Sequence, residues 1–168
     1  MDLGSGTGNL TARLPKASHI TMVDTSEKMH RLAKPKLEGW NLDVVTDDIL
    51  SYVTEVLRSC DVIVSTYALH HLTKDEKRYA LNAMTLALQP GGHLVIGDLM
   101  FEDQTSREAL LTHFVKSGRK GVAQDIEEEF FWDLAVDRLA LDEAGFSIEI
   151  KRFSDLSWAF AAQKPPLD

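Results

Sequence analysis

The sequence predicts an α/β fold built around a mostly parallel β-sheet. Short β-branched runs alternate with helical stretches along the chain, which is the pattern of a sheet whose strands are joined by crossover helices. The clearest strands are apolar on both faces, as expected of strands inside such a sheet. The length of 168 residues, with 44% hydrophobic residues, suits one compact domain with its own core. We therefore expect a single domain over residues 1–168.

The first hundred residues supply four predicted strands and three predicted helices. The strands cover residues 19–23, 42–46, 61–66 and 93–98, and the helices cover residues 9–14, 26–33 and 74–88. Thr73 and Glu76 have the spacing of a capping box, in which each side chain accepts the backbone N–H of the other residue. The sequence Pro90-Gly91-Gly92 cannot continue a helix, so a turn is expected there.

The remainder of the chain predicts three helices and then two paired strands. The helices cover residues 106–115, 123–131 and 135–143, and Gly145 ends the last of them. Apolar and polar residues then alternate over residues 146–151 and again over residues 158–162. This alternation on both sides of a short turn is typical of an antiparallel strand pair.

A glycine-rich loop near the N-terminus is the most informative motif. Gly4, Gly6 and Gly8 follow what would be the end of a first strand and directly precede a helix. Glycine permits backbone angles closed to other residues and lets the main chain approach a ligand near the free N–H groups of a helix start. The nicotinamide fingerprint G-x-G-x-x-G would need glycine in place of Asn9, which disfavours a nicotinamide-dependent oxidoreductase. A tight turn that holds no ligand is the alternative.

Two acidic positions follow the next two predicted strands. Asp24 ends an apolar run, where a carboxylate can accept both hydroxyls of a ribose. Asp48 and Ile49 follow the third strand, where the carboxylate can accept an adenine amino group and the apolar side chain can pack on the ring. Ligands of open α/β sheets bind at the carboxyl edge of the strands, so all these elements are expected to meet there. Each aspartate could equally be a helix cap.

These features resemble the class I S-adenosylmethionine-dependent methyltransferases, and within them the uncharacterised YrrT-like group of Gram-positive bacteria. The resemblance covers nearly the whole chain, through residues 2–8, Asp24, Asp48, residues 65–72, residues 90–92 and the closing aromatic strands. It implies a Rossmann-like methyltransferase fold with a mostly parallel seven-stranded sheet. In that fold the antiparallel last strand is inserted beside the fifth.

The resemblance also implies the cofactor, S-adenosyl-L-methionine, and the residues that hold it. These are Asp2, Gly4, Gly6, Gly8, Asp24, Asp48, Ile49 and Ser65. Asp2 and the glycine loop would hold the methionine end, Asp24 the ribose, and Asp48 with Ile49 the adenine. Family members normally carry an extended segment before the residue equivalent to Asp2. We therefore expect that an N-terminal segment is missing here and that the first strand is truncated.

Residues after the fourth strand are candidates for the methyl-transfer step. The sulfonium of the cofactor is already a good leaving group, so the protein mainly has to hold the acceptor lone pair in line with the methyl group. A general base helps only when the acceptor must lose a proton. Tyr67, His70 and His71 offer a phenol and two imidazoles beside the glycine loop. We expect His71 to face the acceptor and to donate a hydrogen bond to it or to take its proton; capping of the strand end is the alternative for both histidines.

Metal binding is not expected from the sequence. The two histidines have no Cys, Asp or Glu neighbour at the spacing of a zinc site. The single cysteine, Cys60, cannot form an internal disulfide or a thiolate cluster, and we interpret it as a buried small residue.

Charge and composition limit the partners. A net charge of −8 argues against nucleic acid, whose binding draws on lysine and arginine. The apolar runs are too short to cross a bilayer, and no export signal is visible, so a cytoplasmic protein is expected. The acidic run at residues 127–129 and the aromatic run at residues 130–132 could recognise a small cationic acceptor, or form a solvated helix face over a buried aromatic stripe.

The predicted function is therefore methyl transfer from S-adenosyl-L-methionine to a small molecule whose identity the sequence leaves open. The alternative is a degenerate methyltransferase fold that acts as a non-catalytic binding module. A titration with S-adenosyl-L-methionine would distinguish the two, because a degenerate fold that has lost its cofactor site would not bind it. The oligomeric state is also left open.

Overall fold

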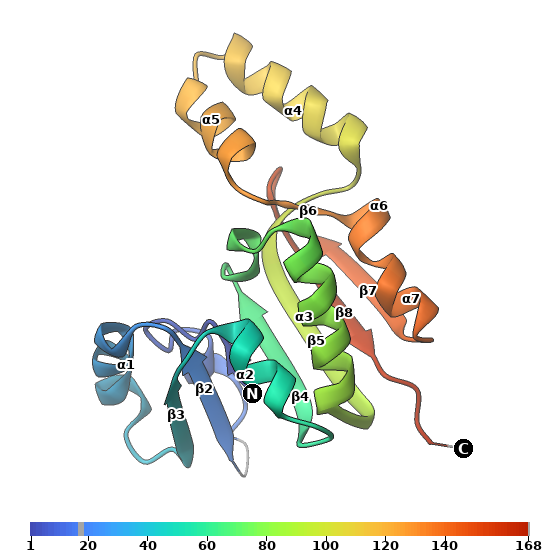
Figure 1. The fold of residues 1–168 in the computed structure, drawn as a ribbon. Helices are drawn as coiled ribbons and strands as arrows, with labels where there is room; N and C mark the ends of the chain where they lie inside the picture. Colours follow the sequence, from blue (N-terminus) through green and yellow to red (C-terminus); the bar gives the residue numbers. More distant parts are fainter. Residues whose placement is uncertain (17–18, 168) are drawn as a thin grey trace.

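The computed structural model describes residues 1–16 and 19–167, and its centre is a mostly parallel sheet (Figure 1). The strand order is β3-β2-β1-β4-β5-β8-β7, with β6 paired to β5 off this path. The strands are β1 (Asp2–Leu3), β2 (Ile20–Asp24), β3 (Leu42–Thr46), β4 (Cys60–Thr66), β5 (Leu88–Phe101), β6 (Trp132–Asp133), β7 (Ser147–Arg152) and β8 (Ser157–Gln163). The β8 strand runs antiparallel to β5 and β7. The predicted seven-stranded sheet, with its antiparallel last strand beside the fifth, is confirmed.

The two-residue strand β6 is an addition that the sequence did not predict. Its Trp132 pairs with Met100 of β5. The first strand is as short as expected, since β1 comprises only Asp2–Leu3, yet it lies at the centre of the sheet between β2 and β4.

The helices of the described residues connect these strands. They are α1 (Glu27–Ala33), α2 (Ile49–Glu55), α3 (Lys74–Ala87), α4 (Gln104–Lys116), α5 (Lys120–Glu128), α6 (Leu134–Asp137) and α7 (Leu139–Glu143), with the 3-10 helices η1 (Thr11–Arg13), η2 (Lys34–Leu37) and η3 (Leu69–His71). Helix α3 sits between α2 and α7 and contacts both (Figure 1). The predicted capping box is present, because Thr73 Oγ accepts the N–H of Glu76 and the Glu76 carboxylate accepts the N–H of Thr73. None of the described helices is long and apolar enough to span a membrane.

Several predicted elements differ from the structure. The helix expected over residues 9–14 is only the 3-10 turn η1, and the helix expected over residues 135–143 is divided into α6 and α7. Helix α2 was not predicted. The sequence Pro90-Gly91-Gly92 follows the end of α3 as expected but forms a bulge within β5 rather than a free turn, because Leu88 pairs with Cys60 while His93 pairs with Val62.

Two burial predictions are also corrected. Strand β3 lies at the edge of the sheet, so Val44 is exposed and the strand is not covered on both faces. Cys60 is half-buried rather than buried, with its thiol donating to the carbonyl of Ala87. Both differences arise from position in the sheet, which a local pattern does not specify.

The main core lies between the sheet and the helices α2, α3 and α7. Leu3, Ile63, Met84 and Ile96 are fully buried there. Each such side chain contributes roughly 1.5–3 kcal/mol relative to full exposure. A smaller core of Phe101, Phe114, Ala123 and Ile126 holds α4 and α5 together beyond the end of β5 (Figure 1). The rigid layer around α3 therefore supports the strand ends at which the site lies.

A lysine is buried within this layer. Lys77 of α3 is only 2% exposed, its ammonium lies 5.1 Å from the centre of the Trp132 ring, and it donates to the carbonyl of Phe130. Burial lowers the pKa of Lys77 to about 8, although the carboxylates of Asp137 and Asp98 act in the opposite direction. The charge on Lys77 therefore destabilises the folded state.

The sign of the resulting pH dependence follows from proton binding. Between about pH 8 and about pH 10 the unfolded chain keeps the Lys77 proton that the folded chain loses, so the free energy of unfolding rises with pH. We expect this rise to be about 2 kcal/mol larger in the wild type than in a Lys77→Met variant. Urea unfolding of both proteins at the two pH values measures it. If the free energy of unfolding rose equally with pH in both proteins, the burial effect would be contradicted, whatever the absolute stability of the variant.

Candidate active site

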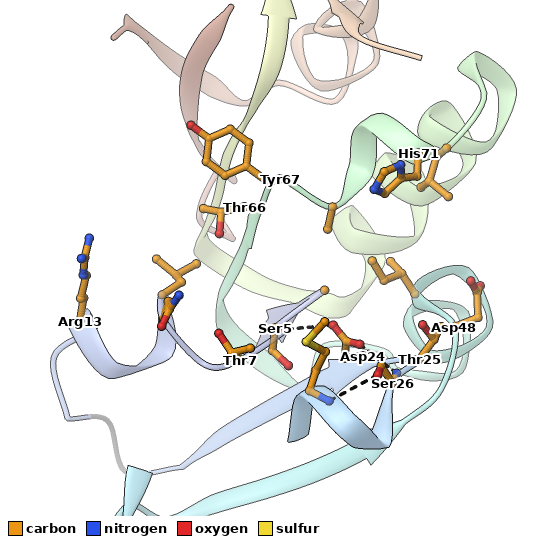
Figure 2. A pocket seen from close by; sticks show the side chains of 18 residues that line it. Ser5, Thr7, Arg13, Asp24, Thr25, Ser26, Asp48, Thr66, Tyr67 and His71 are labelled. Carbon is orange, nitrogen blue, oxygen red and sulfur yellow. Dashed lines mark hydrogen bonds between the residues drawn. The ribbon is translucent and has the colours of Figure 1, made fainter. Parts of the chain in front are cut away.

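A cavity of about 870 Å³ opens at the carboxyl ends of β1, β2, β3 and β4 (Figure 2). Its lining comes from the glycine loop after β1 and from the segments that follow the next three strands. The lining residues are Gly4, Ser5, Gly6, Thr7, Asn9, Leu10, Arg13, Asp24, Thr25, Ser26, Met29, Asp48, Ile49, Thr66, Tyr67, Ala68, His71 and Leu72. Four segments far apart in sequence thus meet at the edge of the sheet where the sequence predicted a ligand.

The glycine loop is shaped by close approach and by left-handed backbone angles. Gly4 has φ +70°, and a Cβ there would lie 2.2 Å from the Cβ of Ala68, so only glycine allows the loop to touch the segment after β4. Gly8 lies deeper, where a Cβ would lie 3.0 Å from Ala33 and Leu37. The Lys36 ammonium donates to the carbonyl of Thr7 and anchors the loop from outside.

Asp24 links the loop to the end of β2. Its Oδ2 accepts the N–H of Gly6 at 2.8 Å and its Oδ1 accepts the N–H of Ser26 at 2.9 Å (Figure 2). Ser26, not Asp24, caps α1, with its hydroxyl accepting the N–H of Met29. Because each carboxylate oxygen can accept a second hydrogen bond, Asp24 is able to fix the loop and still accept from a ligand in the cavity.

Asp48 serves as the N-cap of α2 and lies near Thr25 in the same cavity (Figure 2). Its Oδ1 accepts the N–H groups of Leu50 and Ser51 at 2.8 and 3.2 Å. Ile49 follows it, and its Cδ1 lies 3.4 Å from the point where a Cβ on Gly4 would stand. The helix-cap alternative is therefore the observed state of Asp48, and the apolar surface of Ile49 faces the glycine loop.

Tyr67 and His71 lie at the other end of the cavity, across from the loop (Figure 2). Tyr67 has a left-handed φ of +49°, and its hydroxyl donates to the Ser157 hydroxyl at 2.9 Å. The side chain of His71 is 63% exposed, with Nδ1 placed 3.0 Å from Oε2 of Glu129. A phenol and an imidazole thus face the space beyond the glycine loop.

Comparison with known proteins identifies this arrangement. Residues 1–92 match the family model described as a methyltransferase domain. An uncharacterized methyltransferase of Oceanobacillus iheyensis is 34% identical over 165 residues, which covers 98% of this chain and 76% of the relative. The chain belongs to the class I S-adenosylmethionine-dependent methyltransferases. A methyltransferase of Bacillus cereus is 33% identical with the same coverage.

Solved structures show that the methyltransferase shares its fold with cofactor-bound proteins. The N-methyltransferase NodS of Bradyrhizobium japonicum, solved with S-adenosyl-L-homocysteine, has a TM-score of 0.69 and 22% identity over 98% of this chain and 76% of its own. The magnesium protoporphyrin IX methyltransferase of Synechocystis, solved with the methyl donor, has a TM-score of 0.67 and 17% identity over 97% of this chain and 68% of its own.

Some residues that the sequence assigned to the cofactor do not line the cavity of the methyltransferase. Asp2 is buried and accepts the Thr11 hydroxyl at 2.5 Å, and burial raises the pKa of its carboxyl group. Ser65 is buried and donates to the carbonyl of Leu3 at 2.7 Å. Gly8 packs against α1 and η2. These three residues instead brace the loop and β1 from behind, Asp2 and Ser65 from within strands and Gly8 through its contact with α1 and η2.

His70 is likewise turned away from the cavity. It is 8% exposed, and its Nδ1 lies 2.6 Å from Oδ1 of Asp98. The second oxygen of Asp98 accepts the N–H groups of Leu69 and His70 and, at 3.3 Å, the indole N–H of Trp132. Asp98 is the last residue of the strand predicted over residues 93–98, and the sequence did not indicate that it would hold His70 and Trp132 by hydrogen bonds.

Glu129 does not line the cavity, but it contacts His71 and is the neighbour of the candidate site that the sequence analysis missed most completely. It lies 58 positions from His71 yet contacts it, so the expectation that no carboxylate lies near the two histidines is wrong. Ligand atoms of His70, His71 and Glu129 lie within 4.8 Å of one another. The acidic run was visible in the sequence, but nothing in it indicated which of its members would reach the histidines.

Proposed function

We propose that this methyltransferase binds S-adenosyl-L-methionine in the 870 Å³ cavity and transfers its methyl group to a small molecule. One observation carries the proposal: the glycine loop, Asp24 and Ile49 line the same cavity that ends at Tyr67 and His71. A cavity of this size is in the range that encloses drug-sized ligands. It has room for the cofactor and a small acceptor side by side.

We assign each part of the cofactor to a part of the lining. The methionine end lies against the closely packed backbone of the glycine loop, and Asp24 accepts the ribose hydroxyls through the lone pairs that Gly6 and Ser26 leave open. The adenine lies against Ile49, with Asp48 beside it. The sulfonium then points toward Tyr67 and His71, so an acceptor held there meets the methyl group in line.

The methyl acceptor contacts His71, which is the exposed imidazole at that end of the cavity. Tyr67 shapes the neighbouring wall because its ring is fixed by the bond to Ser157. His70 and Asp98 support η3 from below and do not touch the acceptor. The net charge of −8 favours a small molecule over a nucleic acid as the acceptor.

The second candidate function is a degenerate methyltransferase fold that no longer holds the cofactor and acts as a non-catalytic binding module. Titration with S-adenosyl-L-homocysteine distinguishes the two, because the degenerate fold would not bind this ligand. Release of S-adenosyl-L-homocysteine in a screen of small amines, thiols and carboxylates then tests the transfer itself.

Asp24→Ala is expected to weaken binding of S-adenosyl-L-homocysteine by about 1–3 kcal/mol, because two ribose hydroxyls lose a charged acceptor. Calorimetric titration of the wild type and the variant measures the change. Asp43→Ala is the matched control, since Asp43 is an exposed aspartate of β3 that pairs with His19 outside the cavity. An unchanged dissociation constant in folded Asp24→Ala would remove Asp24 from the cofactor site.

A further inference from the structure

We propose that His70, His71 and Glu129 bind a divalent transition-metal ion, of which Zn²⁺ is the best match, at the acceptor end of the cavity. The inference rests on the proposed function in one respect only, which is that the ion would face the methyl acceptor. Two imidazoles and one carboxylate are the ligand set of open zinc sites with one position left for water or substrate. Mg²⁺ and Ca²⁺ prefer sites made of oxygen ligands, so the two imidazoles disfavour them.

The three groups are already close to the spacing that such an ion needs. Their ligand atoms lie within 4.8 Å of one another, and the rings of His70 and His71 are 4.1 Å apart between centroids. Ligands about 2.0–2.2 Å from a tetrahedral zinc ion stand roughly 3.3–3.6 Å apart. The 3.0 Å between His71 Nδ1 and Glu129 Oε2 is close to this spacing, and a ligand atom of His70 lies within 4.8 Å of both.

A buried carboxylate orients the first ligand. Asp98 is 1% exposed and accepts from Nδ1 of His70, which leaves Nε2 as the nitrogen with a free lone pair. Asp98 is itself fixed by two backbone N–H groups and by the indole of Trp132. A carboxylate behind a histidine ligand sets its tautomer and raises its basicity, and metal sites regularly contain this arrangement.

The backbone delivers the third ligand. Glu129 follows the last residue of α5, and the N–H of the next residue, Phe130, donates to the carbonyl of His70 at 3.0 Å. The carbonyl of Phe130 in turn accepts from the buried Lys77. The carboxylate of Glu129 is thus held beside the histidine pair by two hydrogen bonds to the backbone of the next residue, Phe130.

The three groups differ in their surroundings, which gives the ion an open side. His70 is buried and Glu129 lines a second cavity beside Lys77 and Phe130. His71 is exposed and lines the 870 Å³ cavity, so the side of the ion next to His71 faces that cavity. An acceptor O–H, N–H or S–H bound there loses its proton to water more readily because the ion withdraws electron density. The freed lone pair then forms the bond to the methyl carbon, and the electrons of the broken S–C bond stay on the cofactor sulfur.

The test is titration of chelator-treated protein with Zn²⁺ by calorimetry and with Co²⁺ by visible absorption. We expect one ion per chain and the intense Co²⁺ bands of four-coordinate geometry. His71→Ala and Glu129→Gln are each expected to weaken binding by about 10-fold or more, since each removes one of three ligands. His93→Ala and Glu127→Gln are the matched controls, and both remove exposed side chains outside the cluster.

The outcomes separate this inference from the proposed function. The metal site would be overturned if the protein did not bind Zn²⁺, or if Glu129→Gln and Glu127→Gln bound it equally strongly. His71 and Glu129 would then form only their direct hydrogen bond. A parallel titration with S-adenosyl-L-homocysteine reports on the cofactor site. If the protein binds S-adenosyl-L-homocysteine but no ion, the metal site is overturned and the proposed function stands. If it binds the ion but not S-adenosyl-L-homocysteine, the proposed function is overturned and the metal site stands.

Discussion

His71→Ala is expected to lower the turnover of methyl transfer by about 10²- to 10⁴-fold while the affinity for S-adenosyl-L-homocysteine stays unchanged. The side chain of His71 lies at the acceptor end of the cavity, beyond the residues proposed to hold the cofactor. The substitution removes the imidazole that is proposed to orient the acceptor. The same imidazole is one of the three proposed metal ligands. Binding of the cofactor depends on the loop and Asp24, which the substitution does not touch.

The measurement needs an acceptor, so it follows the screen for S-adenosyl-L-homocysteine release. Turnover per folded molecule is compared among the wild type, His71→Ala and His93→Ala, the last of which removes an exposed imidazole from β5 away from the cavity. A strongly lowered melting temperature with full specific activity would mean that His71 caps the end of β4 and has no part in transfer. A loss of less than about 10-fold would restrict His71 to orienting the acceptor.

Asp98→Ala is expected to lower the free energy of unfolding by about 3–5 kcal/mol. The carboxylate is 1% exposed and accepts from the backbone N–H groups of Leu69, His70 and Leu99 and from the side chains of His70 and Trp132. Alanine leaves all of these donors buried without this acceptor, and each unsatisfied donor costs about 1–3 kcal/mol before the structure relaxes.

Urea unfolding of the wild type, Asp98→Ala and Asp155→Ala measures this effect. Asp155 is a suitable control because it is exposed and forms a surface ion pair with Arg152, so its loss should cost less than about 1 kcal/mol. A similar small cost for Asp98→Ala would show that η3 does not depend on the buried carboxylate.

The sequence predicted well those elements whose signals are local. Helix α3 begins at Lys74 as expected because Thr73 and Glu76 form their box within one turn, and β3 has the predicted bounds because its β-branched run is bordered by polar residues. Helix α2 was missed for a related reason. A helix cap was one of two roles open to Asp48, but the short helix that its carboxylate caps has a weak signal, because it contains three β-branched residues, Ile49, Val53 and Thr54.

The site was predictable only in part, because reaching a cavity depends on tertiary position. Asp24, Gly4 and His71 line it as expected, since each lies at the end of a strand or in the segment that follows one. Ser65 stands two residues before Tyr67, yet it is inside the strand and binds Leu3 instead. The contact of Glu129 with His71 depends on how α4 and α5 pack, because their packing brings the end of α5 next to η3. No local sequence spacing indicates this arrangement.

The arm formed by α4 and α5 separates two sets of proposed contacts along the chain. Every residue proposed to hold the cofactor lies before position 50, whereas Glu129 follows α5 on this arm between β5 and β7 (Figure 1). The arm has its own small core around Phe114 and Ile126, apart from the main core of the sheet. Under the proposed function, substitutions within this one segment would therefore change the surroundings of His71 and leave the proposed cofactor contacts in place.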